Sequence, residues 1–137
     1  MSTPLVPLEP LSLRPATEDD LARLAEVESR VHQAPWTEEG FRGELSKPYS
    51  CVWVLTDDET DTKIAGYIVY WMLLDECQVL NVAVDLPFRG LGLAKRMVRQ
   101  AAAAAVKKDL KTVTLDVRKS NIPAIQLYQG LGFSITS

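Results

Sequence analysis

A seven-residue stretch, Arg89-Gly90-Leu91-Gly92-Leu93-Ala94-Lys95, lies between an apolar run and an alanine-rich segment. The apolar run, 79–84, is typical of a buried strand, and the alanine-rich segment, 94–108, is typical of a helix. The first turn of a helix leaves backbone N–H groups without internal partners and carries partial positive charge. Glycine lets an anion approach such a backbone, and arginine adds a charge-assisted hydrogen bond. The stretch therefore predicts a binding site for a pyrophosphate.

Two common phosphate-binding fingerprints do not fit this stretch. The dinucleotide fingerprint has glycine or alanine three residues after its second glycine, where this chain has Lys95. The phosphate loop of nucleotide triphosphatases requires the pattern Gly-x-x-x-x-Gly-Lys, which the stretch lacks. A glycine-rich turn without a ligand also accounts for Gly90 and Gly92, so the stretch alone leaves both interpretations open.

Two segments together resemble the GCN5-related N-acetyltransferase (GNAT) family. The pattern from Arg89 to Ala94 resembles the family's acyl-CoA-binding motif, Arg/Gln-x-x-Gly-x-Gly/Ala, and TLDVRKSNIPAIQLYQGLGF, 114–133, resembles its closing segment. The resemblance extends from about Leu11 to Phe133. It implies an α/β fold with a mixed, mostly antiparallel sheet flanked by helices. It also implies an enzyme that transfers acetyl from acetyl-CoA to an amine.

Within the family, two further segments resemble the ribosomal-protein-alanine N-acetyltransferases, the RimI group. These segments are HQAPWTEEGFRGEL, 32–45, and DECQVLNVAVDLPFRGLGLA, 75–94. The resemblance implies acetylation of a protein N-terminal amine, with the N-terminal alanine of a small-subunit ribosomal protein as the acceptor. A lysine or small amine as acceptor, and a non-catalytic CoA-binding module, are the alternative interpretations.

The reaction needs a base for the amine and an acid for the departing thiolate. An α-amino group has a pKa of about 7.7–8.0, so one carboxylate acting through water is a sufficient base. The resemblance aligns Asp116 with a glutamate of the RimI group, one methylene longer, and Tyr128 with a tyrosine near the thioester sulfur. We therefore expect Asp116 to act as the base and Tyr128 as the acid. A solvated strand-end carboxylate and a packed aromatic ring are the other interpretations.

The resemblance also implies CoA contacts outside the glycine-rich turn. The backbone of 82–84 would receive the pantetheine arm as a sheet edge receives an added strand. Asn121 matches a family asparagine near CoA, although an asparagine here also suits the N-cap of the following helix. The expected CoA-binding residues are Val82, Ala83, Val84, Arg89, Gly90, Leu91, Gly92, Leu93, Ala94, Lys95 and Asn121.

Composition excludes several other classes of protein. The 137 residues carry a formal charge of −3 with a pI near 5.2, which argues against a general nucleic-acid binder. Cys51, Cys77 and His32 lack zinc-ligand spacing, so no metal is expected. We expect free thiols in a reducing cytoplasm, and neither a signal peptide nor a membrane-spanning run is recognisable. His32 precedes a Pro-Trp turn, and a functional role for it is left open.

The expected helices and strands follow from hydrophobic spacing and capping signals. Thr17 and Asp20 form a capping box before a helix over 18–31, whose inward face includes Leu21, Leu24, Val27, Glu28 and Val31. Thr37 caps a second helix after the Pro-Trp turn. The remaining expected elements are strands at 11–13, 51–55, 63–74, 79–84 and 112–117, helices at 94–108 and 123–129, and a last strand from Phe133.

We interpret 1–10 as a loose leader and 11–137 as a single N-acetyltransferase domain. The family continues beyond Gly-Phe with strands that complete the sheet and border the peptide site, whereas this sequence ends at Ser137. A truncated chain, a sheet completed by a partner and a domain that works without that wall all fit. An exposed sheet edge would favour pairing between chains, which makes a homodimer one interpretation.

Overall fold

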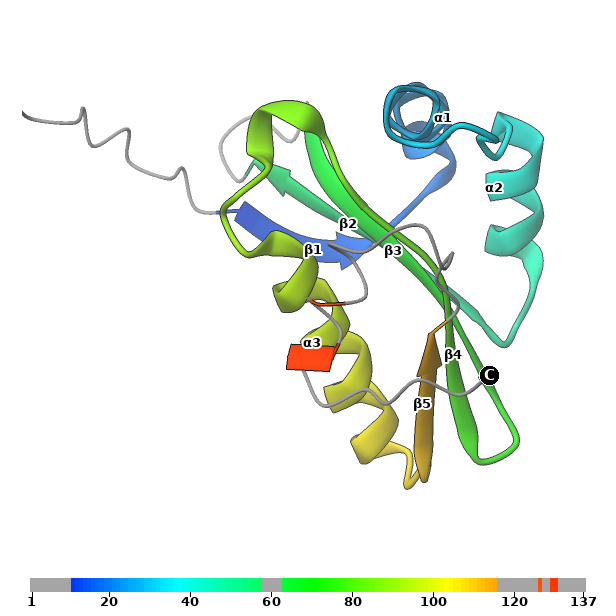
Figure 1. Cartoon of the computed structure of the whole chain (residues 1–137). Coiled ribbons are helices and arrows are strands. Elements are labelled where there is room, and N and C mark those ends of the chain that lie inside the picture. Colours follow the sequence, from blue (N-terminus) through cyan, green and yellow to red (C-terminus); the bar gives the residue numbers. More distant parts are fainter. Residues whose placement is uncertain (1–10, 58–62, 116–125, 127–128, 131–137) are drawn as a thin grey trace, which may run out of the picture.

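The computed structural model in Figure 1 describes residues 11–57, 63–115, 126 and 129–130. Its elements, in chain order, are β1 Leu11–Pro15, α1 Leu21–Val31, α2 Glu38–Ser46, β2 Ser50–Asp57, β3 Ile64–Leu73, β4 Glu76–Val84, α3 Leu93–Lys107 and β5 Thr112–Leu115, with short 3-10 turns at Glu18–Asp20 and Leu86–Phe88. The five strands form one sheet in chain order. Neighbouring strands are antiparallel from β1 to β4, whereas β4 and β5 are parallel. The expected α/β fold with a mixed, mostly antiparallel sheet is therefore confirmed.

Helices cover both faces of this sheet, and each face has its own apolar core (Figure 1). On one face α3 contributes the helical part of the core. The buried residues there are Leu55, Ala65, Ile68, Tyr70, Cys77, Val79, Leu93, Met97, Val98, Ala101 and Ala105. On the other face α1 and α2 contribute. The buried residues there are Leu21, Leu24, Val27, Phe41, Val52, Val54, Ile64, Tyr67, Val69 and Ala83.

The first helix occupies the expected range, 18–31, but it is not α-helical throughout. Its first turn is a 3-10 turn, and the α-helix begins only at Leu21. The buried Asp20 carboxylate accepts a hydrogen bond from the Thr17 N–H at 2.8 Å, as the capping box predicts, and two more from the Arg14 guanidinium at 2.7 and 2.8 Å. The Asp20 N–H bonds to the Thr17 carbonyl. This three-residue spacing makes the first turn tighter than an α-helix.

The β4–α3–β5 unit determines where the sheet opens. The parallel pairing joins Glu76–Val79 of β4 to Thr112–Leu115 of β5 and ends there. At the same position a β-bulge interrupts the pairing of β4 with β3. Tyr70 faces Val79 but the preceding Val69 faces Asn81, so the register shifts by one residue. Beyond Val79, the β4 edge that faced β5 has no partner strand within the described part of the chain. Among the described residues, the β4 backbone edge along 80–84 is therefore open.

Some expectations fall on residues that the structure does not describe. These are the leader 1–10, the helix at 123–129 apart from residues 126 and 129, and the strand from Phe133. The expected strand at 112–117 is confirmed as far as Leu115. The division into a leader and one domain stays a prediction.

Candidate active site

The glycine-rich turn lies between the end of β4 and the start of α3, in the expected strand–turn–helix order. Asp85 begins the turn, and its Oδ1 accepts a hydrogen bond from the Leu86 N–H at 2.9 Å. Gly90 and Gly92 have φ angles of +82° and +75°, a left-handed conformation that strongly favours glycine. A Cβ added at either position would have no neighbour within 4 Å. The glycines therefore serve backbone conformation and an open surface rather than internal packing.

The start of α3 presents backbone donors to this open surface. The first backbone hydrogen bond of the helix joins the Arg96 N–H to the Gly92 carbonyl, so the N–H groups of Leu93, Ala94 and Lys95 precede it. No side chain caps the helix at Gly92, and its first turn has no acidic residue. The N-terminus of α3 thus keeps the positive end of the helix dipole exposed.

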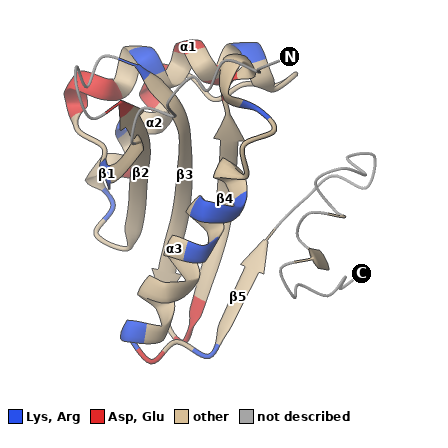
Figure 2. Ribbon diagram, turned by 90° about the vertical axis from the view of Figure 1, so that its left-hand side faces the viewer, with Lys and Arg blue, Asp and Glu red and all other residues tan. Residues whose placement is uncertain are grey.

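Basic side chains add positive charge around the same helix end. Arg89, Lys95 and Arg99 are exposed, and Figure 2 shows lysine and arginine positions along α3. The Arg89 Nε donates to the Val84 carbonyl at 3.4 Å, which keeps this side chain beside the end of β4. Backbone donors, a helix dipole and cationic side chains at one point are the features that bind a diphosphate.

The expected contact strand, 82–84, leads directly into this turn. Its residues pair with β3 on one side, where Val82 faces Ile68 and Ala83 faces Tyr67. Their other backbone edge belongs to the open stretch of β4 beyond Val79. An extended ligand bound along this edge would reach the glycine-rich turn at its far end. The residues present therefore fit a ligand that combines a linear amide-bearing arm with a diphosphate.

The structure brings together every expected CoA-binding residue except one. Residues 82–84 and 89–95 form the continuous surface just described, whereas Asn121 lies outside the described residues. The two expected catalytic residues, Asp116 and Tyr128, also lie outside them. The site assignments stay predictions.

Sequence reasoning missed a buried polar network beside the open edge. Glu28 of α1 is 1% exposed, and its carboxylate accepts hydrogen bonds from three groups. The Asn81 side-chain amide of β4 donates at 2.8 Å, the Tyr67 hydroxyl of β3 donates to the same oxygen, and the Trp36 N–H donates to the other oxygen at 2.9 Å. Burial and the hydrogen bond to Glu28 raise the pKa of Tyr67 well above its usual range, so this phenol remains a donor.

His32, the first residue after α1, completes this network. Its Nε2 lies 3.1 Å from the Asn81 Oδ1 and 3.5 Å from the Glu28 Oε1. The sequence carried a signal for this network, because Glu28 occupies a position on the apolar face of its helix. A carboxylate at a core position requires buried hydrogen-bond donors.

A second polar link connects α1 to the start of the glycine-rich turn. The Arg30 guanidinium donates to both oxygens of Asp85, Nε at 3.2 Å and Nη2 at 2.8 Å. The hydrogen bonds from Arg30 hold the pKa of the Asp85 carboxyl below its usual range. Because Asp85 also binds the Leu86 N–H, this ion pair positions the turn relative to α1.

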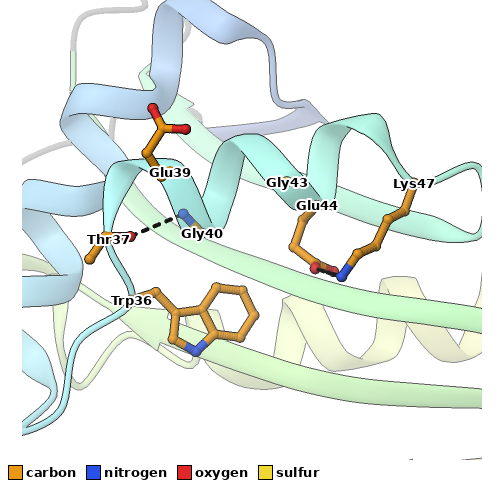
Figure 3. A pocket seen from close by; sticks show the side chains of 7 residues that line it. All are labelled: Trp36, Thr37, Glu39, Gly40, Gly43, Glu44 and Lys47. Atoms are coloured by element: carbon orange, nitrogen blue, oxygen red, sulfur yellow. Dashed lines mark hydrogen bonds and ion pairs between the residues drawn. The ribbon is translucent and has the colours of Figure 1, made fainter.

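A shallow pocket of about 510 Å³ lies along α2, as Figure 3 shows. It is lined by Trp36, Thr37, Glu39, Gly40, Gly43, Glu44 and Lys47. Two of its charged side chains, Lys47 and Glu44, form an ion pair in which Lys47 donates to Glu44. Glu44 also accepts a hydrogen bond from the Ser50 hydroxyl. The pocket belongs to the α1–α2 face of the sheet, whereas the glycine-rich turn leads into α3 on the opposite face.

Across 11–57 and 63–115, no three His, Cys, Asp or Glu residues lie close enough together to hold a metal ion. In the same part of the chain, no helix has both the length and the apolar character needed to cross a membrane.

The sequence matches the Acetyltransferase (GNAT) family over residues 18–133. A Bacillus subtilis protein with the provisional name ribosomal protein bS18-alanine N-acetyltransferase is 34% identical over 115 residues, which cover 83% of this chain and 74% of the relative. The ribosomal protein bS18-alanine N-acetyltransferase of Salmonella typhimurium is 32% identical over 115 residues, covering 84% and 75%.

Solved structures support the same relationship. The crystal structure of the ribosomal-protein-S18-alanine N-acetyltransferase from Escherichia coli superposes with a TM-score of 0.84 at 28% identity, covering 93% of this chain and 80% of that one. A family match over most of the chain, relatives above 30% identity and the shared fold agree with the strand–turn–helix geometry. The chain therefore belongs to the GNAT family of acetyltransferases and is an N-acetyltransferase.

Proposed function

We propose that this enzyme transfers the acetyl group of acetyl-CoA to the N-terminal amine of a protein, with the N-terminal alanine of ribosomal protein bS18 as its acceptor. Two relatives that bear this activity in their names, 34% and 32% identical to this chain, support the choice of acceptor. The observation that carries the choice of donor is the open β4 edge that continues into the uncapped start of α3.

Two parts of this surface would hold acetyl-CoA. The N–H groups around Gly92 and the Arg89 guanidinium would bind the diphosphate, because both supply positive charge at an exposed helix end. The backbone of 82–84 would pair with the pantetheine arm as with an added strand. Bound in this way, acetyl-CoA supplies a thioester carbonyl that an amine can attack. A backbone N–H of this strand would polarise the carbonyl.

The proposed proton transfers use Asp116 and Tyr128. Asp116 would withdraw a proton from the amine through a water molecule, which compensates for a side chain shorter than glutamate. Tyr128 would donate a proton to the departing CoA sulfur. We also propose a cytoplasmic location, where ribosomal proteins are made, whereas a homodimer stays a prediction without support from the described residues.

Mass spectrometry of acceptor peptides tests the proposed function. Peptides beginning Ala-Arg are incubated with acetyl-CoA beside the same peptides with a blocked N-terminus, lysine-containing peptides and free polyamines. We expect a mass increase of one acetyl group on the free N-terminal amine only. Steady preference for a polyamine or a lysine would overturn the acceptor, and acetyl-CoA binding without transfer to any acceptor would indicate a binding module.

Two substitutions test the proposed catalytic pair. Asp116→Ala and Tyr128→Phe should each lower kcat by about 10²-fold or more, because each removes a proton-transfer group. Both should leave the Kd for acetyl-CoA, measured by calorimetry, unchanged. Equal losses of rate and of acetyl-CoA affinity would indicate that these residues bind the donor instead.

A further inference from the structure

The hydrogen bonds around Asn81 determine which ring nitrogen of His32 carries a hydrogen. The Glu28 carboxylate can only accept hydrogen bonds. The Asn81 atom that faces it must therefore be the amide nitrogen, which donates. The Asn81 Oδ1 is then the atom that faces His32, at 3.1 Å from Nε2. A carbonyl oxygen can only accept, so Nε2 carries a hydrogen. In the neutral imidazole, Nδ1 consequently keeps its lone pair free to accept a proton.

His32 also lies where the sheet opens. Its partner Asn81 directly precedes Val82, the first of the expected contact residues on the β4 edge. The pairing of β4 with β5 ends two residues earlier, at Val79. The His32 side chain is 39% exposed, so its ring joins the buried network through Nε2 while remaining accessible to solvent and to an incoming molecule. An amine that attacks a thioester on this edge would approach this region.

We propose that His32 is a catalytic residue that accepts, through Nδ1 and directly or through one water molecule, the proton that the acceptor's ammonium group must lose before it attacks. This inference rests on the proposed function and deepens it. Glu28, Tyr67 and Asn81 act as positioning residues, because they determine which nitrogen of His32 carries the hydrogen.

The ammonium nitrogen loses two protons on its way to the amide, so the reaction can use two proton acceptors. The ammonium first gives one proton to His32, and the freed lone pair forms the C–N bond to the thioester carbonyl carbon. The C–S bond then breaks, and its electron pair leaves on the CoA sulfur. The nitrogen loses a second proton as the amide forms, which Asp116 would accept, and Tyr128 would protonate the sulfur. His32 returns its proton to solvent, so one proton is released for each acetyl group transferred.

The ionisable groups to consider around His32 belong to three elements, α1, β3 and the end of β4. Glu28 of α1 lies 3.5 Å from Nε2, and the Tyr67 hydroxyl of β3 donates a hydrogen bond to Glu28. At the end of β4, Asp85 is engaged by Arg30. Within the described residues, the charged group beside Nε2 of the ring is thus the Glu28 carboxylate.

His32→Gln is the decisive variant, since a glutamine amide keeps a donor towards Asn81 but has no basic nitrogen. The wild type, His32→Gln, His32→Ala and the neighbouring control Gln33→Ala are assayed on a free N-terminal peptide across a pH series. We expect His32→Gln to lower kcat by about 10²-fold and to change the acid limb of the kcat/KM profile. The Kd for acetyl-CoA and the Tm should stay unchanged, and Gln33→Ala should behave as the wild type. Added imidazole should restore activity to His32→Ala, which a purely structural role would not predict.

The outcomes separate this inference from the proposed function. An active wild type with an equally active His32→Gln, or with an unchanged pH profile in that variant, overturns the role of His32 alone. Loss of activity that follows loss of Tm or of acetyl-CoA affinity overturns it as well, because His32 would then be structural. A wild type that acetylates no N-terminal peptide overturns the proposed function and this inference together.

Discussion

The buried network around Glu28 and the turn around Gly92 differ in whether their polar groups are hydrogen-bonded within the protein. Both Glu28 carboxylate oxygens accept hydrogen bonds from protein donors, although the side chain is almost wholly buried. The N–H groups at the start of α3 instead precede the first hydrogen bond of their helix and have no side-chain cap. One region has satisfied its polar groups within the protein, and the other presents them at an open surface.

This difference reflects what an unpaired polar group costs in each environment. A buried group without a partner destabilises the protein by about 1–3 kcal/mol, whereas an exposed N–H is solvated by water. The network therefore maintains the shape of the site, and the turn retains donors for a ligand. Substitutions in the network should reduce stability most, and substitutions in the turn should reduce ligand affinity most.

The largest effect is expected for Glu28→Ala. Its removal leaves the donors of Tyr67, Asn81 and Trp36 without their shared acceptor, so the free energy of unfolding should fall by about 3–5 kcal/mol. Urea denaturation monitored by circular dichroism measures this loss. Glu26→Ala on the same helix is the matched control and should change stability by less than about 0.5 kcal/mol, because Glu26 is exposed. Equal effects of the two substitutions would contradict the distinction.

Gly66→Ala compares a glycine used for packing with the glycines of the turn. A Cβ at Gly66 would lie 2.7 Å from the Ala83 carbonyl oxygen and 2.9 Å from the Met97 Cε, so the β4 backbone would have to shift and the Met97 side chain would have to move away. Unfolding experiments should show a loss of about 2–3 kcal/mol. Gly43→Ala on α2, which has nothing within 4 Å, should not destabilise the protein. A neutral Gly66→Ala would show that the two elements are not tightly packed there.

Arg30→Met tests the link between the two regions and has a defined pH dependence. The hydrogen bonds from Arg30 depress the pKa of Asp85 in the folded protein. Their stabilisation is therefore fully present above the unfolded pKa of about 3.9 and is lost as pH falls through the lower folded pKa. The variant should be less stable than the wild type near neutral pH, and the difference should shrink in acid.

Urea unfolding of the wild type and Arg30→Met across the acid range measures this difference. Arg42→Met is the control, because within the described residues Arg42 forms ion pairs with Glu38 and Glu39, which are exposed on α2. A difference between wild type and Arg30→Met that does not shrink at low pH would argue against a role for the charged Asp85.

Gly92→Ala should weaken the binding of acetyl-CoA and should lower stability less than Glu28→Ala or Gly66→Ala does. Alanine at a φ of +75° costs about 1–2 kcal/mol, and the added methyl group lies where the diphosphate is proposed to bind. We expect the Kd for acetyl-CoA to rise about tenfold or more, equivalent to about 1.4 kcal/mol, as measured by calorimetry. Gly92→Asn should recover part of the stability, because asparagine tolerates this conformation, while affinity remains low. Wild-type affinity in both variants would exclude the turn as the diphosphate site.

Local signals predicted most of the fold correctly. The capping signals at Thr17 and Thr37, the apolar strands and the alanine-rich helix each appear close to their expected positions. The 3-10 form of the turn at Glu18–Asp20 was not predicted, because Arg14 lies on β1, outside the helix, and its contribution to the Asp20 hydrogen bonds depends on how strand and helix pack. Periodicity within the helix contains no information about that packing.

The candidate site was predictable only in its contiguous part. The turn from Arg89 to Lys95 was identifiable because its chemistry depends on neighbouring residues and on the start of one helix. The network was not, because Glu28 was treated as one more position on an inward helical face. The role of His32 was left open, because its contact with Asn81 joins residues 49 positions apart.

The sequence alone determined the strand, the glycine-rich turn and the helix that follows it, because left-handed backbone conformation and unpaired helix N–H groups are local properties. Tertiary structure alone decided which side chains meet beside that turn. Glu28 and Asn81 are 53 residues apart, and Arg30 and Asp85 are 55 residues apart. Their contacts exist because α1 packs across β3 and β4, and that packing reflects apolar burial over the whole sheet rather than any short segment.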